Sequence, residues 1–132
     1  MIDDAASGVL NDPVDALLSL FEFAAAPRSH GPRVCLWLEP GGYAIDAFGT
    51  PEPDRCVMRV SFDENFVPPM QGAEMVLQFE CELATTTLYL ALRGALARLL
   101  EGPDAEALDR WRGDQSLESY LERFNRARAV AG

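Results

Sequence analysis

The sequence contains no lysine, one histidine and only three cysteines among its 132 residues. Its cations are eleven arginines, against twenty-one acidic side chains, and the net charge is −10. Such a charge repels nucleic acid phosphates and anionic lipid, so we expect no nucleic acid partner and no membrane partner. There is no C-x-x-C pair and no cysteine–histidine cluster, so nothing in the sequence indicates a metal site or a cofactor.

The chain also has no uncharged apolar stretch long enough to cross a bilayer. A spanning helix needs about 20 mostly apolar residues. The most apolar run, residues 74–100, is interrupted by charges at Glu80, Glu82, Arg93 and Arg98. No basic segment precedes an apolar one near the start, so no secretory signal is visible. We therefore expect a cytoplasmic protein with reduced cysteines.

Within that apolar run the residue spacing changes from that of a strand to that of a helix. From Met75 to Leu83 apolar and polar side chains alternate, which is typical of a strand with one wet face. After three threonines at 85–87, which offer hydroxyls to cap a helix, leucines recur at helical spacing up to Gly102. The pattern predicts a strand over 75–83 and a helix over 88–101.

The preceding half of the chain predicts one helix and three more strands. Pro13 suits the first position of a helix that Pro27 ends. Alternating side chains predict strands over 34–38, 43–47 and 55–63. Pro40-Gly41 fits the two central positions of a type II turn between the first two of these strands.

The ends of the chain complete the predicted architecture. Asp104 can cap a short helix, and a last helix is predicted over 116–131, whereas residues 1–10 are expected to be loosely ordered. Residues 1–132 then form a single α+β domain. Its order is an N-terminal helix, a four-stranded, mainly antiparallel meander sheet, and two or three C-terminal helices packed on one sheet face. The helix over 88–101 is expected to bury leucines against the sheet; the predicted contacts join Leu92, Leu96 and Leu99 to Leu36, Ile45, Val60 and Phe79.

The two faces of the predicted sheet differ in composition. One is nearly all apolar, and the other mixes aromatic and acidic side chains with an arginine. Aromatic anchors within a charged rim are typical of a protein-binding surface. The candidate partner-binding residues on this second face are Trp37, Asp46, Phe48, Asp63, Glu80 and Glu82. The alternative is that a flanking helix, or the partner in a homodimer, covers Trp37 and Phe48.

The negative charge is confined to one part of the sequence. Residues 1–82 carry a net −10, whereas residues 83–132 carry equal numbers of acids and arginines. An acidic surface attracts a basic protein partner and speeds its association. The plainer interpretation is that the charge keeps the protein soluble.

The sequence carries no signature of catalysis. Two carboxylates on one strand face, Glu80 and Glu82, could serve in acid–base chemistry or bind a metal. A hydrolase would also need a nucleophile with its base, or a third ligand at a defined spacing, and neither is apparent. An enzyme would require a deep pocket that unites these two residues with Asp46 and Asp63. We expect that the protein is not an enzyme.

In size, charge and element order the whole chain is similar to two groups of small acidic proteins. One group is the bacterial immunity proteins that neutralise toxin domains, and the other is the chaperones of secreted effectors. The chaperones typically split their strands around a central helix, whereas all four strands here precede the long helix. The resemblance, which no motif carries, implies an inhibitor that occludes a basic toxin surface. An effector chaperone and a homodimeric structural module are the alternatives.

Overall fold

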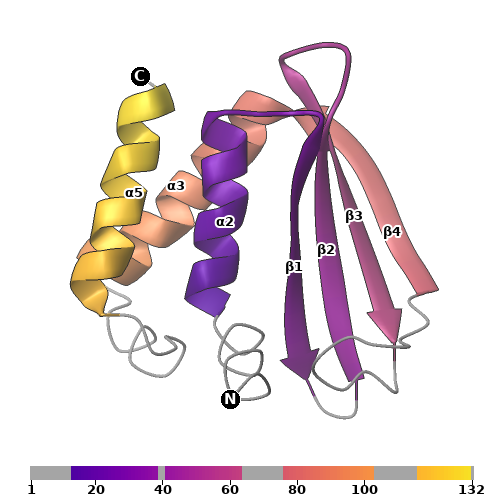
Figure 1. Cartoon of the computed structure of the whole chain (residues 1–132), viewed down its shortest axis with the longest axis horizontal. Helices are drawn as coiled ribbons and strands as arrows, with labels where there is room; N and C mark the ends of the chain where they lie inside the picture. Colours follow the sequence, from indigo (N-terminus) through magenta and orange to yellow (C-terminus); the bar gives the residue numbers. More distant parts are fainter. Residues whose placement is uncertain (1–12, 39–40, 64–75, 103–115, 132) are drawn as a thin grey trace.

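The computed structural model describes residues 13–38, 41–63, 76–102 and 116–131, and the elements follow the predicted α+β order (Figure 1). They are α2 (Pro13–Ala25), β1 (His30–Leu38), β2 (Gly41–Gly49), β3 (Arg55–Asp63), β4 (Val76–Ala84), α3 (Thr85–Glu101) and α5 (Leu117–Ala131). The predicted short helix after Asp104 and the first ten residues lie outside the described ranges.

The four strands form one antiparallel meander in the order β1-β2-β3-β4, as predicted. Two details of the pairing differ from expectation. Leu38 pairs with Gly41, so Gly41 begins β2 instead of occupying the centre of a turn, and Pro40 lies outside the described residues. Between β3 and β4 the register shifts by one residue, since Val60 pairs with Phe79 but Ser61 pairs with Leu77. Gln78 is the extra residue of this bulge.

The helix α3 begins three residues earlier than the leucine spacing alone indicated. Thr85 follows β4 directly, and its backbone N–H donates to the carbonyl of Asp54 at 2.8 Å. The N-cap is Ala84, and no side chain caps the helix. The expectation that a threonine hydroxyl caps it is therefore wrong, because the threonines lie inside the first turn.

The hydrophobic core lies mainly between the three helices. The ring of Phe21 on α2 stacks on Tyr89 of α3 with centroids 4.9 Å apart, and it contacts Phe124 of α5 at 5.2 Å. The α3 leucines expected to be buried, at 92, 96 and 99, are buried. However, α3 packs chiefly on α2 and reaches the sheet at β4.

The helical layer covers one end of the apolar sheet face. The sheet residues buried in the core are Val34 at the middle of β1, Ala47 near the end of β2 and Cys56 near the start of β3. Figure 1 shows the helices gathered on the side of β1, with β4 farthest from α2. Phe79 in β4 is 53% exposed, so the predicted contact between α3 and Phe79 is wrong. The buried stripe of α3 faces α2 instead.

A glycine permits the close approach of α2 to the sheet. A Cβ atom at Gly31 would lie 2.5 Å from the carbonyl oxygen of Ala47 and 2.6 Å from Cδ1 of Phe23. Both distances are far below van der Waals contact. Position 31 in β1 therefore requires glycine, because the Phe23 ring and the Ala47 carbonyl leave no room for a Cβ atom.

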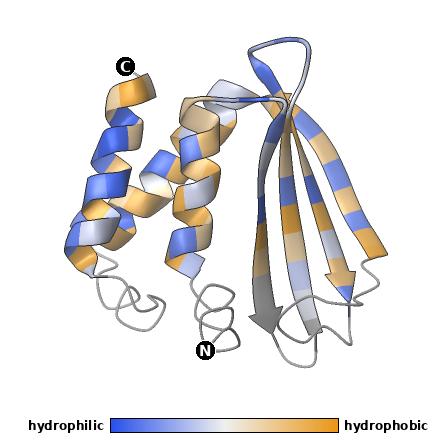
Figure 2. Cartoon of the chain, viewed as in Figure 1, coloured by the Kyte–Doolittle hydropathy of each residue, from blue (hydrophilic) through white to orange (hydrophobic). Residues whose placement is uncertain are grey.

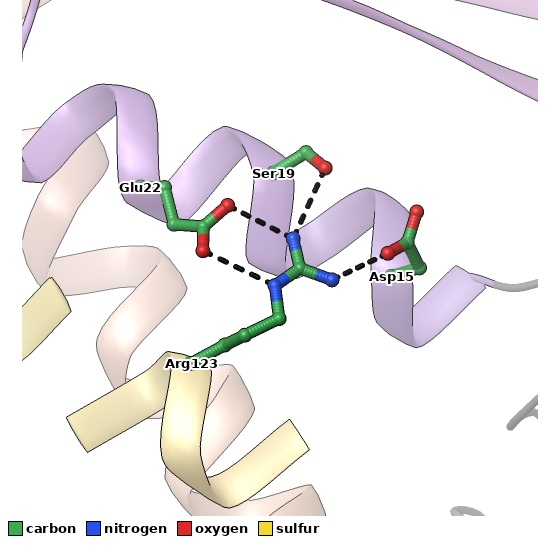
Figure 3. A network of polar contacts seen from close by, with 4 residues as sticks. All are labelled: Asp15, Ser19, Glu22 and Arg123. Carbon is green, nitrogen blue, oxygen red and sulfur yellow. Dashed lines mark hydrogen bonds and ion pairs between the residues drawn. The ribbon is translucent and has the colours of Figure 1, made fainter. Parts of the chain in front are cut away.

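A polar clamp ties the last helix to the first (Figure 3). The guanidinium of Arg123 on α5 donates to both carboxylate oxygens of Glu22, at 3.1 and 2.9 Å, and it also pairs with Asp15. The hydrogen bonds to Glu22 and Asp15 raise the pKa of Arg123, in opposition to burial, which lowers it. Because the acids belong to α2 and the arginine to α5, the clamp sets the position of α5 against α2.

Candidate protein-binding surface

The strand register places four charged residues in one line across the polar face of the sheet. Arg33 pairs with Asp46, Asp46 with Arg59, and Arg59 with Glu80. We call this line the ion-pair row. Its charges alternate from positive on β1 to negative on β4, so each neighbouring pair attracts across the strands.

The strongest pair of this row lies at its β1 end. The Nε and Nη2 atoms of Arg33 donate to the two oxygens of Asp46, at 2.6 and 2.9 Å. The Asp46 side chain is only 10% exposed. Its hydrogen bond raises the pKa of Arg33. Both oxygens of Asp46 therefore accept hydrogen bonds from Arg33 within the sheet, and the carboxylate presents little of its charge to solvent.

The carboxylates of β4 are paired more loosely. Arg59 Nε donates to Glu80 Oε1 at 2.7 Å, and Arg55 Nε donates to Glu82 Oε2 at 3.2 Å. The Glu80 and Glu82 side chains are 43% and 55% exposed. The second oxygen of each carboxylate accepts no hydrogen bond from another residue in the described ranges. Both groups therefore keep capacity to accept a further donor from outside.

The remaining predicted site residues are placed as follows. Phe48 is half-buried, and the Arg59 guanidinium carbon lies 5.2 Å from its ring centroid, in a cation–π contact. Asp63 is buried. The backbone of Trp37 pairs with Gly42, which in turn pairs with Asp63, so Trp37 and Asp63 belong to one line of the sheet. The side chain of Trp37 lies outside the described part of the structure.

The polar face is consequently less acidic than its sequence pattern suggested. Two arginines that pair with predicted site residues, Arg33 and Arg55, were missed by the sequence reasoning. Each lies at or beyond the end of a predicted strand, where alternation was not counted. Extending the alternation by one residue before Val34 would have identified Arg33. Among the described residues eleven acids and nine arginines give a net −2, so most of the charge of −10 belongs to the other segments.

A second line of the sheet is apolar and ends exposed. Val34 pairs with Ile45, Ile45 with Val60, and Val60 with Phe79. We call this line the apolar row. Val34 is buried at the β1 end, whereas Phe79 is half exposed at the β4 end. The helices cover the first part of the row and leave its last member at the surface.

Two further residues of β4 expose large apolar side chains. Val76 is 61% exposed and Leu77 is 51% exposed. Val76 pairs with Phe62, and the ring centroids of Phe62 and Tyr43 lie 4.8 Å apart. Val76 therefore extends this aromatic pair to the sheet edge. Figure 2 shows the alternation of polar and apolar residues along this strand. The sequence pattern placed Leu77 on the core side of the strand and Val76 on the other side, and alternation alone does not show how far the helices reach.

Two cavities lie among described residues. One, of about 390 Å³, lies among the loops that carry Arg28, Thr50 and Pro53. Another, of about 300 Å³, lies at the start of α3 beside Thr86 and Tyr89. Neither is lined by the carboxylates that an enzyme would have to unite. Within the described ranges no three His, Cys, Asp or Glu residues are grouped to hold a metal ion.

No family model, curated protein or solved structure matches this chain. None of the helices in the described segments has both the length and the apolar character needed to cross a bilayer.

Proposed function

We propose that this protein is a small binding module for a basic protein partner, and that it acts as an immunity or inhibitor protein that neutralises a cognate bacterial toxin. The observation that carries the proposal is the composition of β4. Within seven residues it exposes three large apolar side chains and two carboxylates that retain free acceptor capacity. Buried apolar anchors hold complexes together, and charges beside them choose the partner.

The net charge of −10 supports the same proposal through the rate of association. Enzymes that cut nucleic acid bind phosphates, and their sites are therefore basic. An acidic protein is steered towards such a site, and the acceleration weakens as salt screens the charges. Occlusion of the site then follows from simple steric cover and requires no chemistry from the inhibitor.

The first test is capture of the partner from native cell lysate on immobilised protein at low and high salt. We expect a basic protein that is retained at low salt and released at high salt. Co-production of the chain with the captured protein should then suppress the toxicity of that protein to cells. Binding without suppression would leave a binding module but remove the inhibitor role.

The second test compares two double variants with the same change of charge. Glu80→Gln with Glu82→Gln removes the β4 carboxylates, and Glu118→Gln with Glu122→Gln removes two exposed carboxylates from α5. The β4 variant should associate with the captured partner more slowly and with a weaker salt dependence than the α5 variant. Equal association rates would show that the β4 carboxylates take no particular part in docking.

A further inference from the structure

The β4 strand is one of the two edge strands of the sheet. It pairs with β3 on one side, and no described strand pairs with it on the other. Edge strands present backbone N–H and C=O groups that can pair with an added strand. β4 is nine residues long, which matches the length of strand that such an addition can use.

We propose that β4 accepts a fifth strand from the partner protein, and that this strand alternates apolar and basic residues. The inference deepens the proposed function, on which it rests, by naming the binding mode and the chemistry of the partner segment. It is carried by the two lines of residues that cross the sheet and end at β4.

The ion-pair row specifies a basic residue. Its charges alternate along Arg33, Asp46, Arg59 and Glu80, and the row stops on a negative charge. A cation opposite Glu80 would continue the alternation by one strand. The carboxylate can accept it, because Arg59 occupies only one of its oxygens. Glu82 offers a second such position two residues further on the same face.

The apolar row specifies the neighbouring residue. Phe79 is the last member of this row and is half exposed. An apolar side chain opposite Phe79 would bury that exposed surface on the face where Val60 and Ile45 already lie. Since Phe79 and Glu80 are adjacent on opposite faces, a strand that satisfies both must alternate apolar and basic residues.

A second copy of this chain fits the edge less well. Complete antiparallel overlap of two β4 strands, residues 76–84 against 76–84, places Glu80 opposite Glu80 of the second copy. Like charges directly opposite each other destabilise a strand pair. Each chain also carries a net −10, which repels its copy at longer range. The negative charges of β4 that oppose pairing with a second copy therefore favour pairing with a basic strand.

The bulge adds a geometric requirement. At Gln78 the strand has one residue more than its β3 partner. The side-chain Nε2 of Gln78 donates a hydrogen bond to the backbone carbonyl of Val76 at 3.1 Å. A bulge bends its strand and increases the local twist. Pairing is thus most regular over residues 79–84, which contain Phe79 and both carboxylates.

The test uses the whole protein and a synthetic nine-residue peptide in which valine and lysine alternate. One control peptide has the same composition with all lysines in one block, and another replaces lysine by glutamate. Affinity is measured by calorimetric titration, and amide hydrogen exchange reports protection along β4 and β1. We expect the alternating peptide to bind at least about tenfold more tightly than the block peptide and to protect β4 amides only.

Matched variants separate the two rows. Phe79→Ser should weaken the alternating peptide by roughly tenfold, as expected for an aromatic anchor, whereas Leu90→Ser on α3, similarly exposed, should have no effect. Glu80→Gln should weaken it by roughly two- to fivefold, as expected for one partly exposed ion pair, and Glu122→Gln should not. Thermal melts establish that each variant is folded.

Several outcomes would overturn the inference. Equal affinity for the block peptide, or equal effects of the Glu80 and Glu122 variants, would reduce binding to unspecific charge attraction. Protection of β4 that rises with concentration in the protein alone would assign the edge to a second copy. Protection of β1 amides by the peptide would show that the added strand pairs with β1 and not with β4. A captured basic protein that binds without protecting β4 would leave the proposed function standing and remove only the added strand.

Discussion

The helical layer and the β4 edge contain similar side chains in opposite surroundings. Phe124 in α5 is fully buried and packs on Phe21, whereas Phe79 in β4 leaves half of its surface exposed. Arg123 forms hydrogen bonds with two carboxylates and a serine between helices, whereas Arg59 forms an exposed hydrogen bond with Glu80. The difference teaches that residue type does not distinguish buried from exposed positions here. Distance from the helical layer does.

The largest expected contrast is between two phenylalanines. Phe124→Ala should lower the free energy of unfolding by roughly 3–5 kcal/mol, because it empties a filled site in the core. Phe79→Ala should cost less than about 1 kcal/mol, because half of that ring already contacts water. Leu96→Ala should resemble the first, at roughly 2–5 kcal/mol. Urea unfolding measures all three, and equal losses for the phenylalanines would mean that β4 is covered in solution.

Two glycines sharpen the comparison at the backbone. Gly31→Ala should destabilise the fold by roughly 1–3 kcal/mol, because the new methyl group would meet Phe23 and the carbonyl of Ala47. Gly94→Ala should instead stabilise it by roughly 0.5–1 kcal/mol, since Gly94 lies on the exposed side of α3, where an added Cβ atom would meet no neighbouring atom within 4 Å outside its own turn of helix. Thermal unfolding of both variants checks the opposite signs. Stabilisation by Gly31→Ala would contradict the close docking of α2.

The ion pairs are expected to differ in the same direction. Arg123→Ala should cost roughly 1–3 kcal/mol, because it removes charged hydrogen bonds from two half-buried acids on α2. Arg59→Ala should cost less than about 1 kcal/mol, as is usual for an exposed pair. Arg123→Lys should recover only part of the loss, because an ammonium cannot match the two oxygens of Glu22. Chemical denaturation of the three variants tests the order; a smaller loss for Arg123→Ala than for Arg59→Ala would refute it.

The smallest effect concerns the thiol at the junction of sheet and helices. Burial raises the pKa of Cys56 above its ordinary value. The unfolded chain therefore loses this proton first as pH rises past about 8.5, so stability falls with pH until the folded thiol also ionises. The slope should be at most about 1.4 kcal/mol per pH unit for this group. In Cys56→Ala the free energy of unfolding should decline less steeply between pH 8 and 10; an unchanged slope would show that the thiol ionises alike in both states.

Part of the fold could be predicted from residue spacing because the signals are local. The alternation before Leu83 and the leucine spacing after Leu88 identify β4 and α3 wherever they pack. The prediction that Gly41 lies at a turn centre was wrong, because the Pro40-Gly41 pair suits a turn but the strand pairing decides that Gly41 begins β2. The bulge at Gln78 leaves no mark in the alternation, since it depends on β3.

The strand positions of the acidic candidate residues could be predicted from the sequence, but their ion pairs could not. Asp46, Glu80 and Glu82 were identified as residues of the polar face from their strand positions. That each would be paired with an arginine of a neighbouring strand required the register, which sequence spacing does not provide.

The sequence by itself determined the element types, the meander order and the sign of the net charge. These depend on side-chain period, on short connections and on composition, all of which are properties of neighbouring residues. Only the tertiary structure decided which apolar residues are covered. The leucines of α3 face α2 instead of the far part of the sheet, so the apolar row begins buried at Val34 and ends exposed at Phe79. Burial is a property of what packs against a residue, and that partner lies elsewhere in the chain.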